Sequence, residues 1–310
     1  MWESSMVLAV DIGGTYIRTG IIDIEFTIRS FEKQRTVEVI GTKSKKEALK
    51  NLSDYLHDVM IQSGVREKIN HVCLGVPSII AKDKDYVLST PNVPALQDIA
   101  LKSELERNLG LSVSVENDVN LSTLGEYTLL DQRKYPNVVG IYIGTGIGCG
   151  LILNQRLFTG ASNLAAEFGH IPTRLTEKRR QCNCGLYDCL EVWASGSFFD
   201  REMKKAGRDN EIPSIFVDYS SDMLKTHIVD IFFKYLAFGL YTVNTLLNPN
   251  MFIFSGGVVE MEGFPKEKLL DLPYGRLRHE SVANSLETKF GVLGEKAFIH
   301  GALEYYMHYT

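Results

Sequence analysis

VLAVDIGGTYIRTGIID, residues 7–23, is the stretch that decides the fold class of this chain. Its first apolar run ends at Asp11, Gly13 and Gly14, and a second apolar run follows at once. Such a pattern predicts a β-hairpin closed by a glycine-rich turn. The pattern returns over residues 138–153 as VVGIYIGTGIGCGLIL, so the chain repeats its own hairpin. Two copies indicate a duplicated domain with one such hairpin in each half.

Segments outside the two hairpins alternate between strand-like and helix-like patterns. Ser44 and Glu47 form a capping box, which predicts a helix that begins there and stops near Gly64. Two prolines in residues 89–94 exclude a regular element from that loop. Extended segments are expected over residues 27–39, 71–76, 112–115 and 251–255, and further helices over residues 223–247 and 295–307. This alternation is typical of an α/β protein.

Composition and charge exclude several classes of protein. The chain has 310 residues, of which 45% are apolar, and its 33 basic and 38 acidic residues give a formal net charge of -5. Because the sequence has no long basic run, a nucleic acid is not an expected partner. No stretch reaches the roughly 18 apolar residues of a membrane span, and residues 1–5 lack the basic start of a signal peptide. We therefore expect a cytoplasmic protein with two globular domains.

Both glycine-rich turns are suited to gripping phosphate, because glycine lets the backbone approach phosphate oxygens and successive N–H groups can point the same way. The alternative is a pair of tight turns that contact no ligand. Neither turn is a Walker A loop or a Rossmann fingerprint, since each leads into a strand. Asp11 is a candidate partner of a hydrated Mg²⁺ on a nucleotide, which is expected between the two halves. The candidate nucleotide-binding residues are Asp11, Gly13, Gly14, Thr15, Gly144, Thr145, Gly146, Gly148, Gly256 and Gly257.

Asp118 is the candidate general base. Glu116-Asn117-Asp118 follows a short strand, at the kind of strand end where α/β folds place their chemistry. Phosphoryl transfer requires positioning, charge neutralisation and a carboxylate that accepts the proton of the acceptor hydroxyl. The alternative is that Asp118 only caps the following helix. Local sequence leaves both interpretations open.

A cluster of His170, Cys182, Cys184 and Cys189 indicates a metal site. One histidine and three cysteines are an accepted structural zinc set, and thiolates disfavour magnesium. The alternative is free thiols beside an unrelated histidine, because the Cys-x-Cys spacing is less diagnostic than paired Cys-x-x-Cys motifs. Two carboxylates flank the cluster and are candidate partners for sugar hydroxyls or else solvated surface acids, namely Glu167 and Glu191.

Taken together, the motifs resemble those of the ROK sugar kinases over essentially the whole chain. DIGGT at residues 11–15 resembles the first phosphate motif of that family, GTGIG at 144–148 the second, and SGGV at 255–258 the segment near the adenosine. ENDVN at residues 116–120 resembles the catalytic motif, and TPN at 90–92 resembles the sugar loop. The residues from Glu167 through Glu191 resemble the signature that holds zinc and sugar ligands.

The resemblance implies an actin-like ATPase fold, related to ribonuclease H, with duplicated βββαβα-type lobes and a cleft between them. It implies ATP with Mg²⁺ and a structural Zn²⁺ as cofactors and Asp118 as the catalytic base. The implied sugar-binding residues are Asn92, Asn117, Asp118, Glu167, His170 and Glu191, and the implied zinc ligands are His170, Cys182, Cys184 and Cys189. The expected domains are residues 1–122, residues 123–292 and a C-terminal helix at 293–310 that returns to the first lobe.

Two positions depart from the family pattern. The family has glycine before the signature glutamate, where this chain has Ala166, and glycine before the third cysteine, where it has Asp188. Neither departure removes a ligand. A positive φ at Asp188 would strain the zinc loop, although Asp tolerates that conformation better than most residues.

The resemblance implies ATP-dependent phosphorylation of a hexose at its 6-hydroxyl. The stretches between the motifs resemble those of D-allose kinases most, which makes conversion of D-allose to D-allose 6-phosphate the expected reaction. Glucokinase or N-acetylmannosamine kinase activity is the alternative within the family, and a sugar sensor without catalysis is the alternative from another class. Repressors of the family carry a DNA-binding domain before the first phosphate motif, whereas ten residues precede Asp11 here. A homodimer is the family-level expectation.

Overall fold

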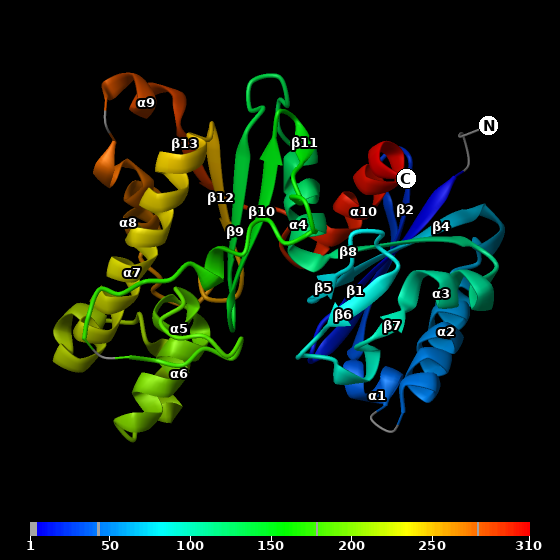
Figure 1. Cartoon of the computed structure of the whole chain (residues 1–310), viewed down its shortest axis with the longest axis horizontal. Helices are drawn as coiled ribbons and strands as arrows, with labels where there is room; N and C mark the ends of the chain where they lie inside the picture. Colours follow the sequence, from blue (N-terminus) through cyan, green and yellow to red (C-terminus); the bar gives the residue numbers. More distant parts are fainter. Residues whose placement is uncertain (1–4, 42–43, 178, 278) are drawn as a thin grey trace. The chain divides into compact units, whose positions relative to one another are not determined.

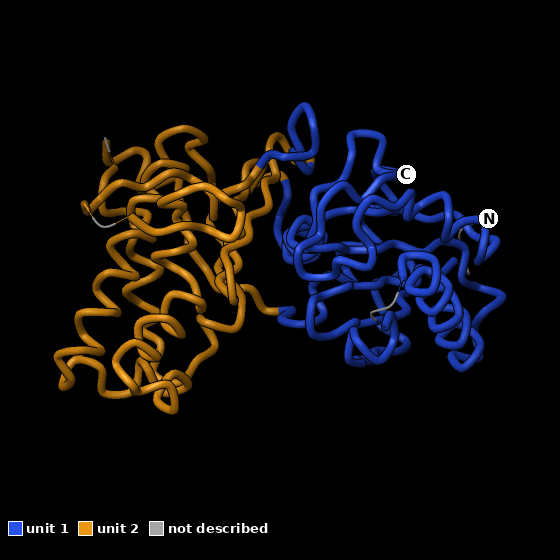
Figure 2. The backbone as a smooth tube through the Cα atoms, turned by 60° about the horizontal axis from the view of Figure 1, so that its bottom comes forward, with its two compact units in different colours: residues 1–132, 157–165, 293–310 blue, residues 133–156, 166–292 orange. Residues whose placement is uncertain are grey.

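The computed structural model describes residues 5–41, 44–177, 179–277 and 279–310. The chain forms two compact units (Figure 2), of which unit 1 comprises residues 1–132, 157–165 and 293–310, and unit 2 comprises residues 133–156 and 166–292. Both units contain a five-stranded sheet with helices packed against it (Figure 1). In the described part of the chain, no helix combines the length and apolar character that crossing a membrane requires.

The sheet of unit 1 has the strand order β3-β2-β1-β4-β8. β1, β2 and β3 form an antiparallel meander, and β4 and β8 continue the sheet parallel to β1. β1 is buried along its whole length, which explains its unbroken apolar run. The strands are β1 (Met6–Ile12), β2 (Tyr16–Asp23), β3 (Ile28–Arg35), β4 (Ile69–Val76) and β8 (Ser112–Asn117).

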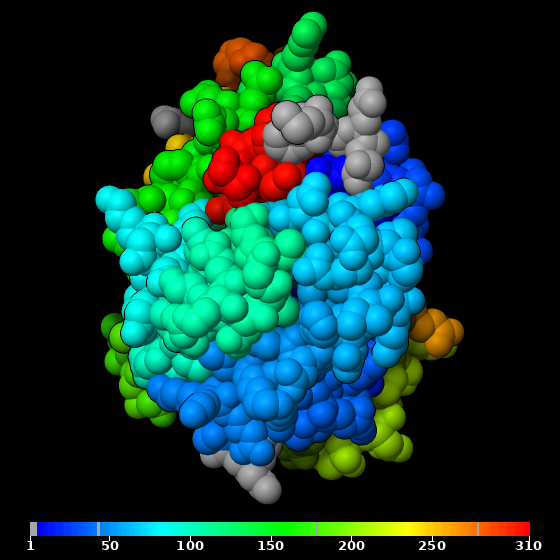
Figure 3. Space-filling model, turned by 90° about the vertical axis from the view of Figure 1, so that its right-hand side faces the viewer, coloured from blue at the N-terminus to red at the C-terminus, as the bar shows by residue number. Residues whose placement is uncertain are grey.

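Helices cover both faces of this sheet. α2 (Lys45–Gln62) and α3 (Leu101–Leu109) share an apolar core with β1 and lie side by side on the surface seen in Figure 3. α4 (Asp118–Thr128) and α10 (Ala297–Tyr309) pack on the sheet and on each other. Their backbones cross closely, because a Cβ on Gly301 would lie 1.7 Å from the carbonyl oxygen of Leu121. α4 belongs entirely to unit 1, so the boundary expected after residue 122 falls within this helix.

Unit 2 repeats the topology of unit 1. Its sheet has the order β11-β10-β9-β12-β13, with β9 and β10 antiparallel and with β12 and β13 parallel to β9. The predicted duplication is therefore present in the strand order of the two sheets. The strands are β9 (Val138–Ile143), β10 (Ile147–Leu153), β11 (Arg156–Leu157), β12 (Met251–Ser255) and β13 (Glu287–Phe290).

One apolar core of unit 2 joins this sheet to the long helix α7 (Met223–Leu247). It is rich in phenylalanine, and it includes the sulfur-bearing side chains of Cys182 and Cys189. The cysteine cluster thus lies at the edge of a packed core and not on a free loop. The other helices of the unit are α5 (Glu191–Ala194), α6 (Gly196–Lys205), α8 (Lys266–Asp271) and α9 (Glu280–Ser285).

The expected extended segment over residues 27–39 is wrong at its end. β3 stops at Arg35, and Thr36–Ile40 forms the short helix α1. The β-branched residues of this segment favour a strand, but the side chains of Val39 and Ile40 are buried in the core of unit 1 in helical form. Tertiary packing therefore overrides the local preference.

A small third sheet precedes β8 along the chain of unit 1. It contains β5 (Ile79–Ile80), β6 (Tyr86–Ser89) and β7 (Ile99–Ala100) in antiparallel pairs. The loop after β6 is irregular over residues 90–93, as expected. The expected bounds of 89–94 are too wide, because Ser89 still belongs to β6 and Pro94, whose fixed φ suits the first position of a helix, begins a 3₁₀ turn at Pro94–Leu96. This sheet therefore carries the expected sugar loop.

Candidate active site and metal centre

The first glycine-rich turn joins β1 to β2 and exposes its backbone. Its carbonyl groups face the protein: Thr36 at the start of α1 donates from its backbone N–H to the carbonyl of Thr15 and from Oγ1 to that of Gly13. Within the described residues, the amides of Gly14 and Thr15 have no acceptor. Exposed N–H groups with their carbonyls tied back are what an anion requires.

The second turn joins β9 to β10 in unit 2 and is held in the same way. The backbone N–H of Gly196 at the start of α6 donates to the carbonyl of Gly144 at 2.7 Å, and Ser197 donates to the carbonyl of Thr145 from its N–H and its hydroxyl. Thr145 is exposed. In both units the beginning of a helix therefore fixes the carbonyls of the turn. Gly148 lies beyond the turn, in β10, opposite Tyr142.

Gly256 and Gly257 follow β12 and lie beside the second turn. Gly256 has a φ of 105°, and a Cβ there would lie 2.5 Å from the carbonyl oxygen of Ile143, the last residue of β9. Gly257 is open to solvent on its side-chain position. Unit 2 therefore brings the expected adenosine segment directly next to the second glycine-rich turn, and only glycine permits that approach.

Asp118 begins α4, but Asn117 caps the helix. The side-chain oxygen of Asn117 accepts hydrogen bonds from the N–H groups of Val119 and Asn120. One oxygen of Asp118, Oδ1, accepts from the N–H of Val119, and within the described residues no other residue donates a hydrogen bond to Oδ2. The alternative that Asp118 is only the N-cap is thus wrong, because Asn117 does that work. Since the Oδ1 of Asn117 is used in the cap, its amide is left to donate to a ligand.

The environment of Asp118 suits a general base. Its pKa is raised to about 7, mainly by burial and next by the neighbouring carboxylate of Asp11, against the lowering effect of the Val119 N–H. Asp11 is itself buried near the end of β1, and burial raises its pKa while an ion pair with Arg18 at 2.6 Å lowers it. Gly75 in β4 lets α4 begin here, because a Cβ on Gly75 would lie 3.1 Å from the Cα of Asp118.

Asn92 lies next to the first phosphate turn in unit 1. It is exposed in the loop after β6. A Cβ on Gly14 would lie 3.1 Å from the Cβ of Asn92 and 3.2 Å from its carbonyl oxygen. The expected sugar loop and the expected phosphate turn of this unit are therefore in contact.

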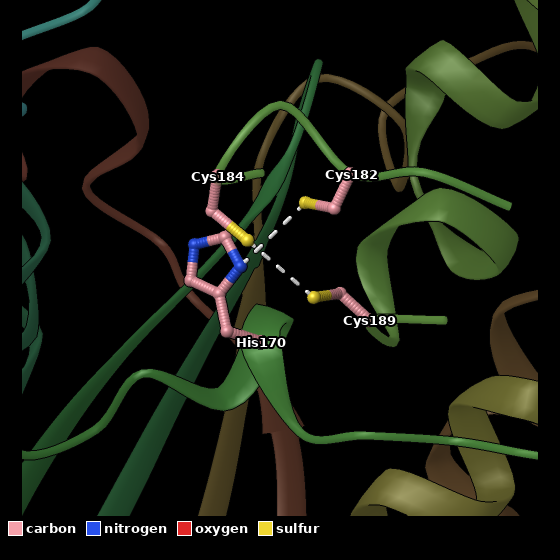
Figure 4. Close-up of side chains that lie close together, drawn as sticks. All are labelled: His170, Cys182, Cys184 and Cys189. Carbon is pink, nitrogen blue, oxygen red and sulfur yellow. Dashed lines mark hydrogen bonds between the residues drawn. The ribbon is translucent and has the colours of Figure 1, made fainter. Parts of the chain in front are cut away.

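The expected metal ligands converge in unit 2 (Figure 4). The ligand atoms of His170, Cys182, Cys184 and Cys189 all lie within 4.8 Å of one another. Sγ of Cys184 lies 3.6 Å from Sγ of Cys189, and Sγ of Cys182 lies 3.7 Å from Nδ1 of His170. A tetrahedral zinc with Zn–S bonds of about 2.3 Å requires ligand separations of roughly 3.6–3.8 Å. The four side chains thus fit zinc, which would hold the loop between them.

His170 has one ring nitrogen for the metal and one for another partner. Nδ1 faces the cysteines, whereas Nε2 lies 3.7 Å from Oε2 of Glu167, too far for a direct hydrogen bond. With Nδ1 on a metal, the other nitrogen carries a proton and can donate to a carboxylate or hydroxyl. Glu191 reaches the same group, since its Oε1 lies 3.1 Å from Sγ of Cys182. Two of the expected sugar ligands of unit 2, Glu167 and Glu191, therefore lie beside the cluster that contains the third, His170.

Both departures from the family glycines have positive φ, 69° at Ala166 and 62° at Asp188. The cost at Asp188 is offset by its side chain: one carboxylate oxygen accepts from the backbone N–H of Arg180 and the other from Nε of Arg179. These bonds tie together the two ends of the loop that holds Cys182 and Cys184. The methyl of Ala166 provides no such compensation.

Several residues that hold the candidate site residues in place lie outside the sequence motifs. Thr36 and Ser197 act on turns far from them in the sequence, and neither stands in a motif. The only local sign of their role is that each stands at the beginning of a helix, which follows a strand in the case of Thr36 and a serine in the case of Ser197. Lys84, which contacts the residue two before Asp118, was likewise not identified.

Comparison with known proteins agrees with these motifs. A model of the ROK family matches residues 7–306 of the chain. The N-acetyl-D-glucosamine kinase of Pectobacterium carotovorum subsp. carotovorum is 31% identical over 264 residues, which cover 82% of this chain and 84% of that enzyme. The glucokinase of Streptomyces coelicolor is 34% identical over 208 residues, which cover 67% of this chain and 61% of that enzyme.

Solved structures show the same fold. A ROK family glucokinase from Streptomyces griseus, in complex with glucose and AMPPNP, superposes with a TM-score of 0.75 at 25% identity, covering 97% of this chain and 98% of that one. A ROK family transcriptional regulator, a homolog of the E. coli MLC protein, superposes with a TM-score of 0.81 at 20% identity, covering 97% of this chain and 77% of that one. The second likeness shows the fold alone, because both kinases and regulators use it.

Proposed function

This chain belongs to the ROK family, and from that membership we propose that it is an ATP-dependent hexose kinase that phosphorylates the 6-hydroxyl of its sugar. The observation that carries the proposal is Asp118, a carboxylate at the start of α4 with a pKa of about 7, whose Oδ2 receives no hydrogen bond from another residue in the described part of the chain. A base with a pKa near the working pH is both ionised and able to hold a proton. A protein that only sensed sugar would not need one.

Each unit supplies a defined part of the reaction. Unit 1 contributes Asp118 as the base, and Asn117 and Asn92 as sugar ligands. Unit 2 contributes Glu167, His170 and Glu191 as sugar ligands, with zinc fixing the loop on which they stand. The two glycine-rich turns and Gly256-Gly257 are the nucleotide ligands. Bound Mg²⁺ would neutralise charge on the transferred phosphoryl group.

In this mechanism the oxygen of the sugar 6-hydroxyl attacks the γ-phosphorus in line, and its proton passes to Oδ2 of Asp118. The bond from the γ-phosphorus to the bridging oxygen of the β-phosphate breaks, so that ADP leaves as the sugar 6-phosphate forms. The protein contributes mainly position and charge, because phosphoryl transfer needs little covalent help. Exposed amides of Gly14 and Thr15 stabilise negative phosphate oxygens. Asp11 pairs with Arg18 at 2.6 Å and, when ionised, would accept a hydrogen bond from a water of the hydrated Mg²⁺.

D-Allose is the substrate that the intervening stretches of sequence favour. The relatives named above are kinases of N-acetyl-D-glucosamine and of glucose, so these sugars are the competing candidates. Allose and glucose differ at the 3-hydroxyl, and a site built to hydrogen-bond one orientation of a hydroxyl can reject the other strongly.

An ADP-release assay over a panel of hexoses tests the proposal. The panel contains D-allose, D-glucose, N-acetyl-D-glucosamine and N-acetyl-D-mannosamine, each with its 6-deoxy analogue as the matched control. We expect turnover with at least one hexose and none with its 6-deoxy form, and we expect D-allose to give the highest kcat/KM. Turnover of a 6-deoxy sugar would overturn the assigned position. Sugar binding without any ADP would favour the non-catalytic sensor.

A further inference from the structure

Lys84 is a half-buried lysine whose ammonium reaches two other elements of unit 1. It lies in the turn between β5 and β6 with a φ of 59°. Its Nζ donates to Oε2 of Glu116 at 2.5 Å and to the hydroxyl of Tyr305 at 2.7 Å. The ammonium also lies 5.0 Å from the centre of the Tyr305 ring. One cation therefore joins the hairpin, the end of β8 and the helix α10.

Glu116 connects Lys84 to the residues on either side of Asp118. Its side chain is almost fully buried, with 2% of the residue exposed. While Oε2 accepts from Lys84, Oε1 accepts from the backbone N–H of Asn117 at 2.8 Å and from Nδ2 of Asn120 at 3.0 Å. These two residues stand on either side of Asp118 along the chain. The carboxylate thus fixes the turn from which Asp118 projects.

We infer that Lys84 is a positioning residue for Asp118 and acts through Glu116. This inference rests on the proposed function for its kinetic part only. Without the ammonium, the carboxylate of Glu116 is buried with no cation beside it, and we expect it to move from its present position. Such a move lengthens the hydrogen bonds that Oε1 accepts from Asn117 and Asn120 and loosens the start of α4. Tyr305 cannot replace the lysine, because its hydroxyl is neutral.

The hairpin that carries Lys84 does not depend on this lysine for its own fold. The neighbouring residue Asp85 accepts from the N–H of Ser103 at 2.8 Å and from its hydroxyl at 2.7 Å, which ties the turn to α3. Asn163 donates to the carbonyl of Ala81 at 2.8 Å on the other side of the turn. Removing the ammonium is therefore expected to release Glu116 and leave the hairpin in place.

The test compares Lys84→Met, which removes the charge at similar length, with Lys84→Arg, which keeps it. Lys82→Met is the matched control, because Lys82 is an exposed lysine of the same turn. Two measurements are made on each full-length protein. Hydrogen exchange followed by mass spectrometry reports the opening of residues 116–124, and steady-state kinetics on the best hexose report kcat and KM separately.

We expect Lys84→Met to speed amide exchange in residues 116–124 at least tenfold and to lower kcat at least tenfold, with KM for ATP changed less than threefold. Lys84→Arg should recover most of both losses, and Lys82→Met should match the wild type. Unchanged exchange in Lys84→Met overturns the inference whatever the kinetics, and so does faster exchange with a normal kcat. Should the wild type lack kinase activity, the proposed function fails, while the exchange data still decide whether Lys84 holds this turn.

Discussion

The pH dependence of turnover is the property that Asp118 should control most directly. A general base accepts a proton only when ionised, so kcat/KM for the hexose should follow the ionised fraction of Asp118. With a pKa of about 7, that fraction rises from about 0.1 at pH 6 to about 0.9 at pH 8. We therefore predict a rise of about tenfold over this interval. A carboxyl with the ordinary value of 3.8 would give a flat profile.

Asp11→Asn is the perturbation that tests the cause of the shift. Burial is the largest cause, and the negative charge of Asp11 is the second. Removing that charge should move the rise of kcat/KM with pH, the acid limb of the profile, to lower pH, and the rise itself should remain. Asp11 is also a candidate nucleotide partner, so kcat/KM is expected to fall in the variant. The pH at which kcat/KM reaches half of its maximum does not depend on the size of that maximum.

The assay measures kcat/KM for the hexose between pH 5.5 and 8.5 at saturating ATP and Mg²⁺. Titration of the nucleotide itself is common to all variants and cancels in the comparison. Asp58→Asn, which removes an exposed carboxylate from α2, is the matched control and should leave the limb unmoved. A profile that is flat in the wild type, or a limb that moves to higher pH in Asp11→Asn, would refute the reasoning.

Three further predictions concern the metal, the backbone and stability. Protein purified without added metal should contain about one zinc per chain by elemental analysis, and Cys184→Ser should lose both zinc and thermal stability; full retention of both would count against the site. Ala166→Gly should raise the free energy of unfolding by up to about 1 kcal/mol in urea titrations, since relief of about 1–2 kcal/mol of left-handed strain exceeds the added chain entropy; a loss would contradict the strain argument. Asp118→Asn should raise the free energy of unfolding at pH 8 and change it little at pH 4. A carboxyl whose pKa is raised in the folded state favours folding below its unfolded pKa, and this contribution is lost as the pH rises through about 7. The gain in the free energy of unfolding at pH 8 is therefore at most about 4 kcal/mol.

The sequence predicted those parts of the fold that depend on local pattern. The two hairpins, the N-cap at Ser44 and the helix over residues 223–247 are confirmed, because apolar spacing and turn residues determine them locally. Of the predicted capping box, the bond from the N–H of Glu47 to Oγ of Ser44 is present. The helix at Thr36–Ile40 was missed, since its β-branched residues favour a strand and only packing decides otherwise.

The candidate site likewise has a part that the sequence predicts and a part that depends on tertiary contacts. The sequence identified the residues that stand in motifs, and the convergence of His170 with the cysteines follows from the metal chemistry of their side chains. The residues that support them are set by tertiary contacts. Lys84 meets Glu116 across 32 positions of sequence, and no spacing rule connects them. The choice of Asn117 over Asp118 as the helix cap likewise depends on backbone geometry that both residue types allow.

Asp118→Asn tests the central claim most directly, because it removes the base and keeps the shape of the side chain. Calorimetric titration of the variant with the best hexose and with a non-hydrolysable ATP analogue should give dissociation constants within about twofold of the wild type. Its kcat should fall by roughly a hundredfold or more, the contribution of a positioned general base. Wild-type turnover in a variant that binds both ligands normally would contradict the account.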